Sequence, residues 1–158
     1  QFHRILEIME NIAITQEYLR SIDVHTILPQ QEPFVMIDKL VHFELTTSTT
    51  ETQIRESNIF VDEGRFSPSG MMENIAQTCA ARVGFYNKYI LHKDVQMGFI
   101  GAVRNYTVHE LPAVGTTIYT KVDILEEVFG MTLAAAEIRC GDKIIATAEI
   151  KLSVRNIE

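Results

Sequence analysis

One carboxylate on a long apolar stretch is the first candidate for chemistry in this sequence. Glu73 is the only aspartate or glutamate between Arg65 and Arg82, and its neighbours are methionine, isoleucine and alanine. Gln77 follows four residues later, which places both side chains on one face of a helix. A carboxylate in such surroundings needs hydrogen-bond partners or a function such as proton transfer. The alternative is a charge that favours the positive end of the helix dipole and makes an ordinary hydrogen bond to the glutamine.

A helix over residues 67–91 positions these two side chains. Its apolar residues recur at helical spacing, and Pro68 lies between two serines where a helix would start. The stretch carries too little charge for a solvated helix, so we expect other elements to enclose it. Glu73 and Gln77 would then share a mostly buried environment.

Strand-like sequence surrounds the helix. Residues 34–45 are rich in β-branched and aromatic side chains and predict a first strand. Residues 46–54 are rich in threonine, which predicts an edge strand or a partly ordered connection. Residues 96–110 predict a strand with an exposed edge, and the alternation over residues 118–154 predicts three antiparallel strands. We therefore expect an α+β fold in which a curved sheet wraps the helix, and a dimer that continues the sheet.

Composition bounds the remaining possibilities. The 158 residues, 46% of them hydrophobic, fit one domain over residues 1–158, with residues 1–22 as a helical extension interrupted near residues 13–15. A net charge of −7 argues against nucleic-acid binding, and no apolar run approaches the ~20 residues of a membrane span. No leader pattern is visible, so we expect a cytoplasmic protein. The two cysteines, Cys79 and Cys140, match no disulfide or zinc motif, and we expect neither a metal nor a cofactor.

Three motifs in order carry a resemblance to a known family. Residues 28–38 read Leu-Pro-Gln-Gln-Glu-Pro-Phe-Val-Met-Ile-Asp, and residues 73–77 read Glu-Asn-Ile-Ala-Gln. These are similar to the leucine-proline-histidine-x-x-proline-phenylalanine segment and the glutamate-x-x-alanine-glutamine helix motif of the beta-hydroxyacyl-[acyl carrier protein] dehydratases, which have the hot-dog fold. Residues 101–103 and 113–116 resemble that family's next strand and turn. The resemblance covers residues 28–154, and three motifs in order are far more specific than one.

The resemblance implies a hot-dog fold, a long central helix wrapped by a curved antiparallel sheet, with an extra N-terminal helix here. It also implies a homodimer or a trimer of dimers, in which the motif histidine of one subunit faces the helix carboxylate of the other. The implied substrate is a 3-hydroxyacyl thioester on acyl carrier protein, and the product is a trans-2-enoyl thioester. This chain departs from the motif at Gln30, which stands in place of the histidine. A glutamine cannot accept a proton at neutral pH.

The motif positions suggest a role for each candidate residue. Glu73 would transfer protons, Gln77 would orient it, and Gln30 would only position substrate. Backbone amides at the start of the helix would donate to the thioester oxygen. The expected substrate-binding residues are Gly70 and Met71 at the helix start and Phe34, Met36 and Phe85 along an acyl tunnel, although core packing is an alternative for each of the last three.

Three functional hypotheses follow. The first is a 3-hydroxyacyl-[acyl carrier protein] dehydratase-like enzyme of fatty-acid or polyene-type lipid synthesis, in which Glu73 makes both proton transfers or His25 replaces the missing histidine. The second is a thioester hydrolase in which Glu73 activates water. The third is a non-catalytic acyl-thioester binding or partner subunit, paired with a histidine-bearing homologue. The carrier is either acyl carrier protein or coenzyme A, and a local excess of basic residues over positions 82–104 favours the acidic protein carrier.

Overall fold

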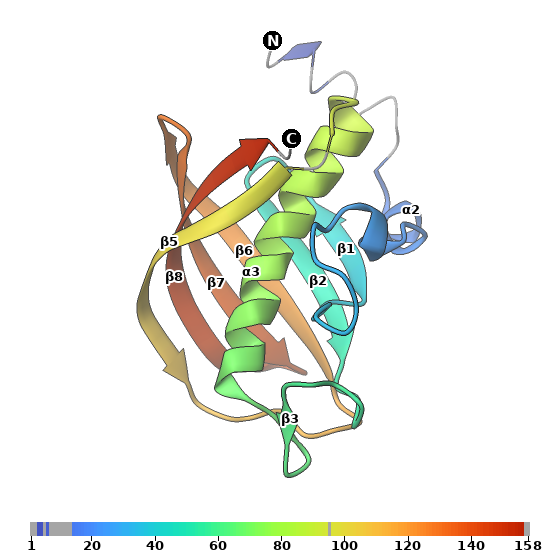
Figure 1. Cartoon of the computed structure of the whole chain (residues 1–158), viewed down its shortest axis with the longest axis vertical. Helices are drawn as coiled ribbons and strands as arrows, with labels where there is room; N and C mark the ends of the chain where they lie inside the picture. The colour runs from blue at the N-terminus through green and yellow to red at the C-terminus, as the bar shows by residue number, and fades with distance from the viewer. Residues whose placement is uncertain (1–2, 5, 7–13, 95, 157–158) are drawn as a thin grey trace.

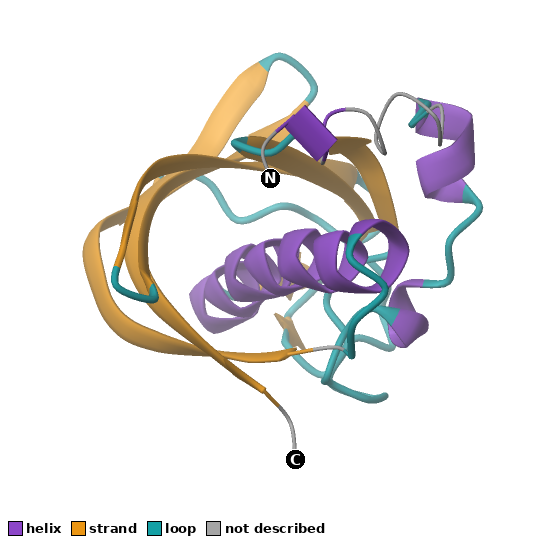
Figure 2. Cartoon of the chain, turned by 90° about the horizontal axis from the view of Figure 1, so that it is seen from above, coloured by secondary structure: helices purple, strands orange, loops and turns teal. Residues whose placement is uncertain are grey.

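A long helix lies in the hollow of a curved antiparallel sheet in the computed structural model, which describes residues 3–4, 6, 14–94 and 96–156. The helix is α3 (Pro68–Phe85), and the six strands follow the order β1-β2-β6-β7-β8-β5 (Figure 1). Seen from above, the sheet curves around the helix (Figure 2). The predicted hot-dog architecture is therefore confirmed. The strands are β1 (Lys39–Phe43), β2 (Thr47–Gln53), β5 (Gln96–Val108), β6 (Thr117–Val128), β7 (Met131–Cys140) and β8 (Lys143–Asn156), with a small separate pair, β3 (Val61–Asp62) and β4 (Arg65–Phe66).

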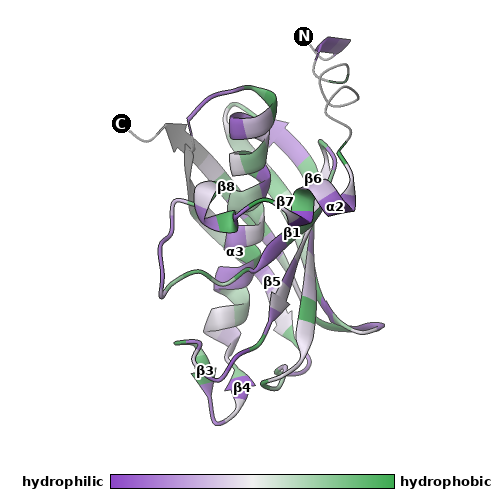
Figure 3. Ribbon diagram, turned by 90° about the vertical axis from the view of Figure 1, so that its right-hand side faces the viewer, coloured by the Kyte–Doolittle hydropathy of each residue, from purple (hydrophilic) through white to green (hydrophobic). Residues whose placement is uncertain are grey.

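The helix α3 is held by a cap at its start and by burial along its length. The Ser67 hydroxyl accepts a hydrogen bond from the Gly70 amide at 3.1 Å, and Pro68 occupies the first turn, where its missing N–H costs nothing. Hydrophilic and hydrophobic bands intermingle along the helix (Figure 3), as expected for a helix enclosed on several sides. One turn of π-helix, η2 (Tyr86–Ile90), continues α3, so the predicted extent of 67–91 agrees with the structure to within a residue.

The threonine-rich strand β2 is not an edge strand, and that prediction was wrong. It lies between β1 and β6, and its inward side chains Ser48, Thr50 and Thr52 are buried. The hydroxyls of Thr50 and Thr52 can be buried here because α3 presents polar partners to them, whereas the buried Ser48 hydroxyl has no hydrogen-bond partner among the described residues. The Thr50 and Thr78 hydroxyls, for example, lie 2.7 Å apart. A strand with few apolar residues can therefore be central when the element above it is also polar.

The edges of the sheet are formed by β1 and β5. The first strand is shorter than predicted and begins at Lys39, because residues 34–38 run as irregular chain. The strand β5 pairs with β8 and ends the sheet order, so it is the predicted edge strand. The predicted antiparallel meander is confirmed as β6, β7 and β8.

The N-terminal helix is seen as α2 (Gln16–Arg20), which lies beside β1 and β2 (Figure 1). Thr15 has an extended backbone and caps α2, which agrees with the predicted interruption of the N-terminal helix near residues 13–15. Most of the predicted helix before this point lies outside the described residues. Arg20 donates from both terminal nitrogens to Glu51 of β2 at 3.0 Å, and the Tyr119 hydroxyl donates to the same carboxylate at 2.7 Å. This cluster joins α2 to the sheet. In the described part of the chain, no helix is long and apolar enough to cross a membrane.

Candidate active site

Gln77 connects the central helix to the loop before β1. Its side chain is fully buried, and its Oε1 accepts from the Met36 backbone N–H at 2.6 Å. Its Nε2 donates to the Phe34 carbonyl at 2.7 Å and to Glu73 Oε1 at 2.9 Å. The two backbone partners fix which way the amide faces, because only its oxygen can accept from an N–H. Gln77 therefore presents an N–H to the Glu73 carboxylate.

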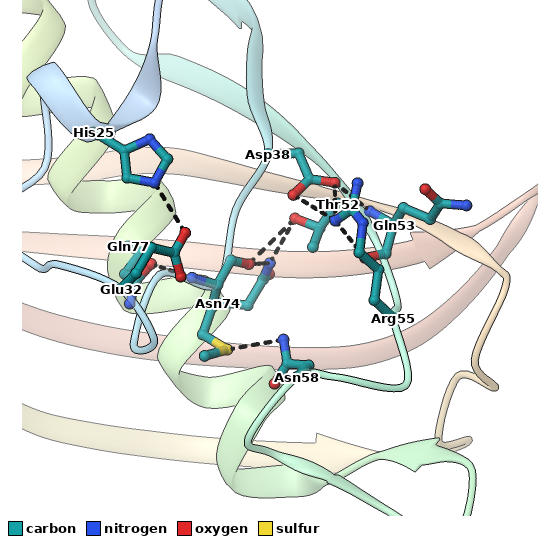
Figure 4. Close-up of polar contacts among 10 residues, drawn as sticks. His25, Glu32, Asp38, Thr52, Gln53, Arg55, Asn58, Asn74 and Gln77 are labelled. Atoms are coloured by element: carbon teal, nitrogen blue, oxygen red, sulfur yellow. Dashed lines mark hydrogen bonds and ion pairs between the residues drawn. The ribbon is translucent and has the colours of Figure 1, made fainter.

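Asn74 completes the attachment of the same loop (Figure 4). Its Nδ2 donates to the Met36 carbonyl at 2.8 Å and to Thr52 Oγ1 at 3.1 Å, and its Oδ1 accepts from the Thr120 hydroxyl. Asn74 has no exposed surface. Both backbone groups of Met36 are thus bound by side chains of α3, from Asn74 and Gln77. The helix, the loop and the strands β2 and β6 are joined through these two residues.

Glu73 is half-buried beside this attachment, with one carboxylate oxygen bound by Gln77. Among the described residues, no histidine, lysine or arginine makes an ion pair with it. The arrangement is an oriented carboxylate whose second oxygen can face a substrate. Such a group can transfer a proton or activate a water molecule.

Gln30, the residue in the place of the motif histidine, is half-buried. Its amide oxygen Oε1 is buried and has no hydrogen-bond partner among the described residues. A buried acceptor without a partner costs about 1–3 kcal/mol. The Gln30 amide oxygen is therefore an acceptor for which the described residues supply no donor. Its role in positioning substrate stays a prediction.

His25 was the candidate to replace the missing histidine. Its Nδ1 lies 2.6 Å from Asp23 Oδ1. Its Nε2 lies 2.9 Å from Glu32 Oε1, a contact drawn in Figure 4. The hydrogen bonds to Glu32 and Asp23 raise the pKa of His25 above its ordinary value of 6.5. Because both ring nitrogens are occupied, His25 ties together two ends of the loop that carries Gln30. It is not free to serve as a base toward Glu73.

Asp38, which ends the loop motif, holds the loop to β2. Its carboxylate accepts from the Gln53 amide at 2.8 Å and from Arg55 Nη1 at 3.0 Å (Figure 4). The nearby Asn58 side chain donates to the Met36 sulfur at 3.3 Å. The motif aspartate therefore has a structural role here, because its oxygens are used in fixing the chain between the loop and the sheet.

The start of α3 does not offer the predicted free amides at Gly70 and Met71. The helix begins at Pro68 with Ser67 as its cap, so the Gly70 amide donates to the Ser67 hydroxyl and the Met71 amide donates to the Ser67 carbonyl at 2.9 Å. Both residues are also buried. The prediction that these amides would receive the thioester oxygen was wrong for this conformation, because the helix itself uses them.

The three predicted tunnel residues lie in different surroundings. Phe34 lies beside Gln77 and is 57% exposed, so it is available to contact a ligand. Met36 is buried in the main core. Phe85 is fully buried in a second core, where its ring centroid lies 4.7 Å from that of Phe43 and 5.4 Å from that of Tyr89, as the core-packing alternative describes. Its place in a tunnel stays a prediction. No group of three or more potential metal-binding side chains occurs among the described residues.

Comparison with known proteins identifies the family. A family model of ApeP-like proteins, described as ApeP dehydratase, matches residues 22–156. The chain belongs to the ApeP-like dehydratase family. The match spans the loop with Gln30, the helix α3 and all six strands of the main sheet. No curated protein matches the chain.

Solved structures share the fold of this ApeP-like chain. The dehydratase heterocomplex ApeI:P from Xenorhabdus doucetiae matches with a TM-score of 0.80 and 15% identity, over 87% of this chain and 93% of that chain. A hypothetical thioesterase from Streptococcus pneumoniae, solved with coenzyme A, matches with a TM-score of 0.60 and 8% identity, over 74% and 84% of the two chains. A Streptococcus mutans protein bound to acetyl coenzyme A matches with a TM-score of 0.62 and 11% identity, over 82% of this chain and 96% of that chain. At these identities, the likeness is one of fold.

Sequence reasoning gave no role to Asn74 in this ApeP-like site. A signal was available, because Asn74, Gln77 and Thr78 are polar residues at helical spacing in an otherwise apolar stretch. Buried polar residues at such spacing need partners on a neighbouring element. The threonines of β2 supply these partners. They are distant from α3 in the sequence, so no local pattern indicated the pairing.

Proposed function

We propose that this chain is a subunit of a dehydratase that acts on 3-hydroxyacyl thioesters, with Glu73 as the residue that transfers protons. The observation that carries the proposal is the hydrogen bond from Gln77 Nε2 to Glu73 Oε1 at 2.9 Å. Gln77 is itself fixed by Met36 and Phe34, so the orientation of the carboxylate is built into the fold. Membership of a dehydratase family supports the reaction class.

The reaction removes a proton from C2, beside the thioester carbonyl, and expels the hydroxyl from C3 as water. A trans-2-enoyl thioester and one water molecule are the products, so no oxidant or reductant is needed. Glu73 can give a proton to the departing hydroxyl and be reprotonated from C2, directly or through a second residue. Gln77 would keep one oxygen of the carboxylate occupied and direct the other toward the substrate.

The second proton-transfer group would come from another subunit. Gln30 cannot take a proton, and His25 is held by two carboxylates. In the dehydratases that this sequence resembles, the histidine reaches the carboxylate across a dimer interface. A homodimer of this chain would place Gln30 opposite Glu73, whereas a histidine-bearing homologue would complete the site. The solved dehydratase heterocomplex from Xenorhabdus doucetiae supports such a pairing, with β5 as the edge available to continue the sheet.

Thioester hydrolysis is the second candidate, and one observation favours it. No histidine makes an ion pair with Glu73 among the described residues, and a single oriented carboxylate is enough to activate water against a thioester carbonyl. The fold is shared with a hypothetical thioesterase solved with coenzyme A. Release of free thiol would distinguish this reaction from dehydration.

The test incubates the protein with 3-hydroxyacyl thioesters of acyl carrier protein and of coenzyme A. The protein is assayed alone and with a histidine-bearing hot-dog homologue, and both enoyl absorbance and free thiol are followed. We expect enoyl product from the mixture and its loss with Glu73→Gln. The exposed Glu126 supplies a matched control, because Glu126→Gln makes the same chemical change on the outside of β6.

A gain-of-function variant sharpens the test. Gln30→His should allow the chain alone to form enoyl product, because it restores the residue that the motif carries. Free thiol without enoyl product would favour the hydrolase. Neither product, with acyl ligand still bound, would refute a catalytic role and favour the binding-subunit hypothesis.

A further inference from the structure

A cavity lies on the other side of α3 from the candidate active site. It has a volume of about 560 Å³ and lies between the C-terminal half of α3 and the ends of β6, β7 and β8. This volume is within the ~300–1,000 Å³ of typical small-molecule sites. Its walls are mainly apolar, with Val83 and Tyr86 from the helix side and Ile124, Met131 and Leu152 from the sheet.

The cavity is distinct from the site at Glu73. Residues 73 and 82 are nine positions apart, which on an α-helix is half a turn out of phase and about 13.5 Å along the axis. Their partners differ accordingly. The Glu73 side of the helix contacts Phe34 and Met36 through Gln77, whereas Arg82 reaches the carbonyl of Leu45.

Arg82 is the charged group of this cavity, and its hydrogen bonds are incomplete. Its side chain is only 14% exposed. Its Nη2 donates to the Leu45 carbonyl at 2.6 Å, but its Nε is buried without a partner among the described residues. Glu127 is the nearest carboxylate and lies 3.9 Å from Nη1, with 58% of its side chain exposed. Burial lowers the pKa of Arg82, as expected for a cation that is poorly compensated.

The turn between β6 and β7 forms the rim of the cavity and has an unusual residue. Phe129 and Gly130 form a two-residue turn, and both have positive φ, 52° and 76°. Asn, Asp or Gly is favoured at the first position of such a turn, and a bulky residue there is strained. Phe129 is nevertheless fully exposed in this chain. Its side chain gives no packing within the chain that would offset the strain.

We propose that this cavity binds an amphiphile that has an apolar chain and a carboxylate head. The head would accept from Nη1 of Arg82 in place of the exposed Glu127, which lies 3.9 Å from that atom. The chain would lie against the apolar walls, and Phe129 would cover it at the rim. The proposal does not depend on the reaction at Glu73, since the two sites lie on opposite sides of the helix.

The test is isothermal titration calorimetry of the full chain with decanoate and with 1-decanol, which shares the chain but has no charge. We expect decanoate to bind at least tenfold more tightly than decanol. Arg82→Gln should remove that preference. Glu127→Gln should tighten decanoate binding about three- to tenfold, because it removes a competing negative charge, and leave decanol unchanged.

Two further variants keep the result interpretable. Glu73→Gln should leave decanoate binding unchanged, and a loss of binding in that variant would place the ligand in the active site instead. Phe129→Asn suits the turn better, so it should fold at least as well and yet weaken both ligands. Equal affinities for decanoate and decanol, or weaker decanoate binding by Glu127→Gln, would overturn the proposal. If Arg82→Gln does not fold, the other variants decide the question.

Discussion

Replacing Asn74 by alanine tests whether the buried network holds the site together. The asparagine has no exposed surface and makes three side-chain hydrogen bonds, to the Met36 carbonyl and to the hydroxyls of Thr52 and Thr120. Each such bond contributes about 0.5–1.5 kcal/mol, and a buried group left without its partner costs about 1–3 kcal/mol. Thr120 is 1% exposed, so water cannot replace the lost acceptor. We expect Asn74→Ala to lower the free energy of unfolding by about 3–5 kcal/mol.

A double-mutant cycle separates this network from general loss of packing. Thr120→Val removes the hydroxyl and leaves the Asn74 oxygen without its donor. Combined with Asn74→Ala, it also removes the hydroxyl that the first change left unsatisfied. The double variant should therefore be more stable than the sum of the two single effects predicts, by about 1–2 kcal/mol.

Urea denaturation followed by far-ultraviolet circular dichroism measures these changes, since the chain has no tryptophan. All variants are compared at one protein concentration, because self-association changes apparent stability. A cost below about 1 kcal/mol for Asn74→Ala, or a strictly additive cycle, would refute the argument that these hydrogen bonds attach the Met36 loop to the helix.

Three further outcomes follow from particular contacts. Gly84→Ala should lower the melting temperature, because the new Cβ would lie 1.9 Å from the Ile27 carbonyl oxygen. The overpacking costs about 1–3 kcal/mol, which exceeds the ~1 kcal/mol gained in helix propensity. An unchanged melting temperature would contradict this. The pKa of His25 is raised in the folded state by its hydrogen bonds to Glu32 and Asp23. The contribution of these bonds to the free energy of unfolding is therefore complete below about pH 6.5 and is lost as the pH rises through the folded pKa. Urea titrations of His25→Asn and wild type should therefore differ more at pH 6 than at pH 9, and the reverse trend would be evidence against the pairing. Burial raises the pKa of Cys79 to about 12, so iodoacetamide at pH 8 should modify Cys140 in the native protein and Cys79 only after denaturation, as mass spectrometry can show.

The sequence alone determined the elements whose signals are local. Helical spacing and the Ser67 and Pro68 start located α3, and alternation located β6, β7 and β8. The pairing of Glu73 with Gln77 also followed from the sequence, because residues four apart on a helix are neighbours. The order of the motifs indicated the hot-dog fold and the dehydratase family. Each of these inferences depends on residues within one element or on a register that local pattern defines.

Tertiary structure alone decided which residues meet across elements. The threonines of β2 looked like an edge strand because their partners, Asn74 and Thr78, lie more than twenty residues away. Phe85 faces a core built with the N-terminal segment, which no local pattern specifies. The incomplete hydrogen bonding of Arg82 likewise depends on what the sheet places around it. The burial of a side chain and its hydrogen-bond partners depend on how distant segments of the chain pack around it. The spacing of residues within one segment does not contain that information.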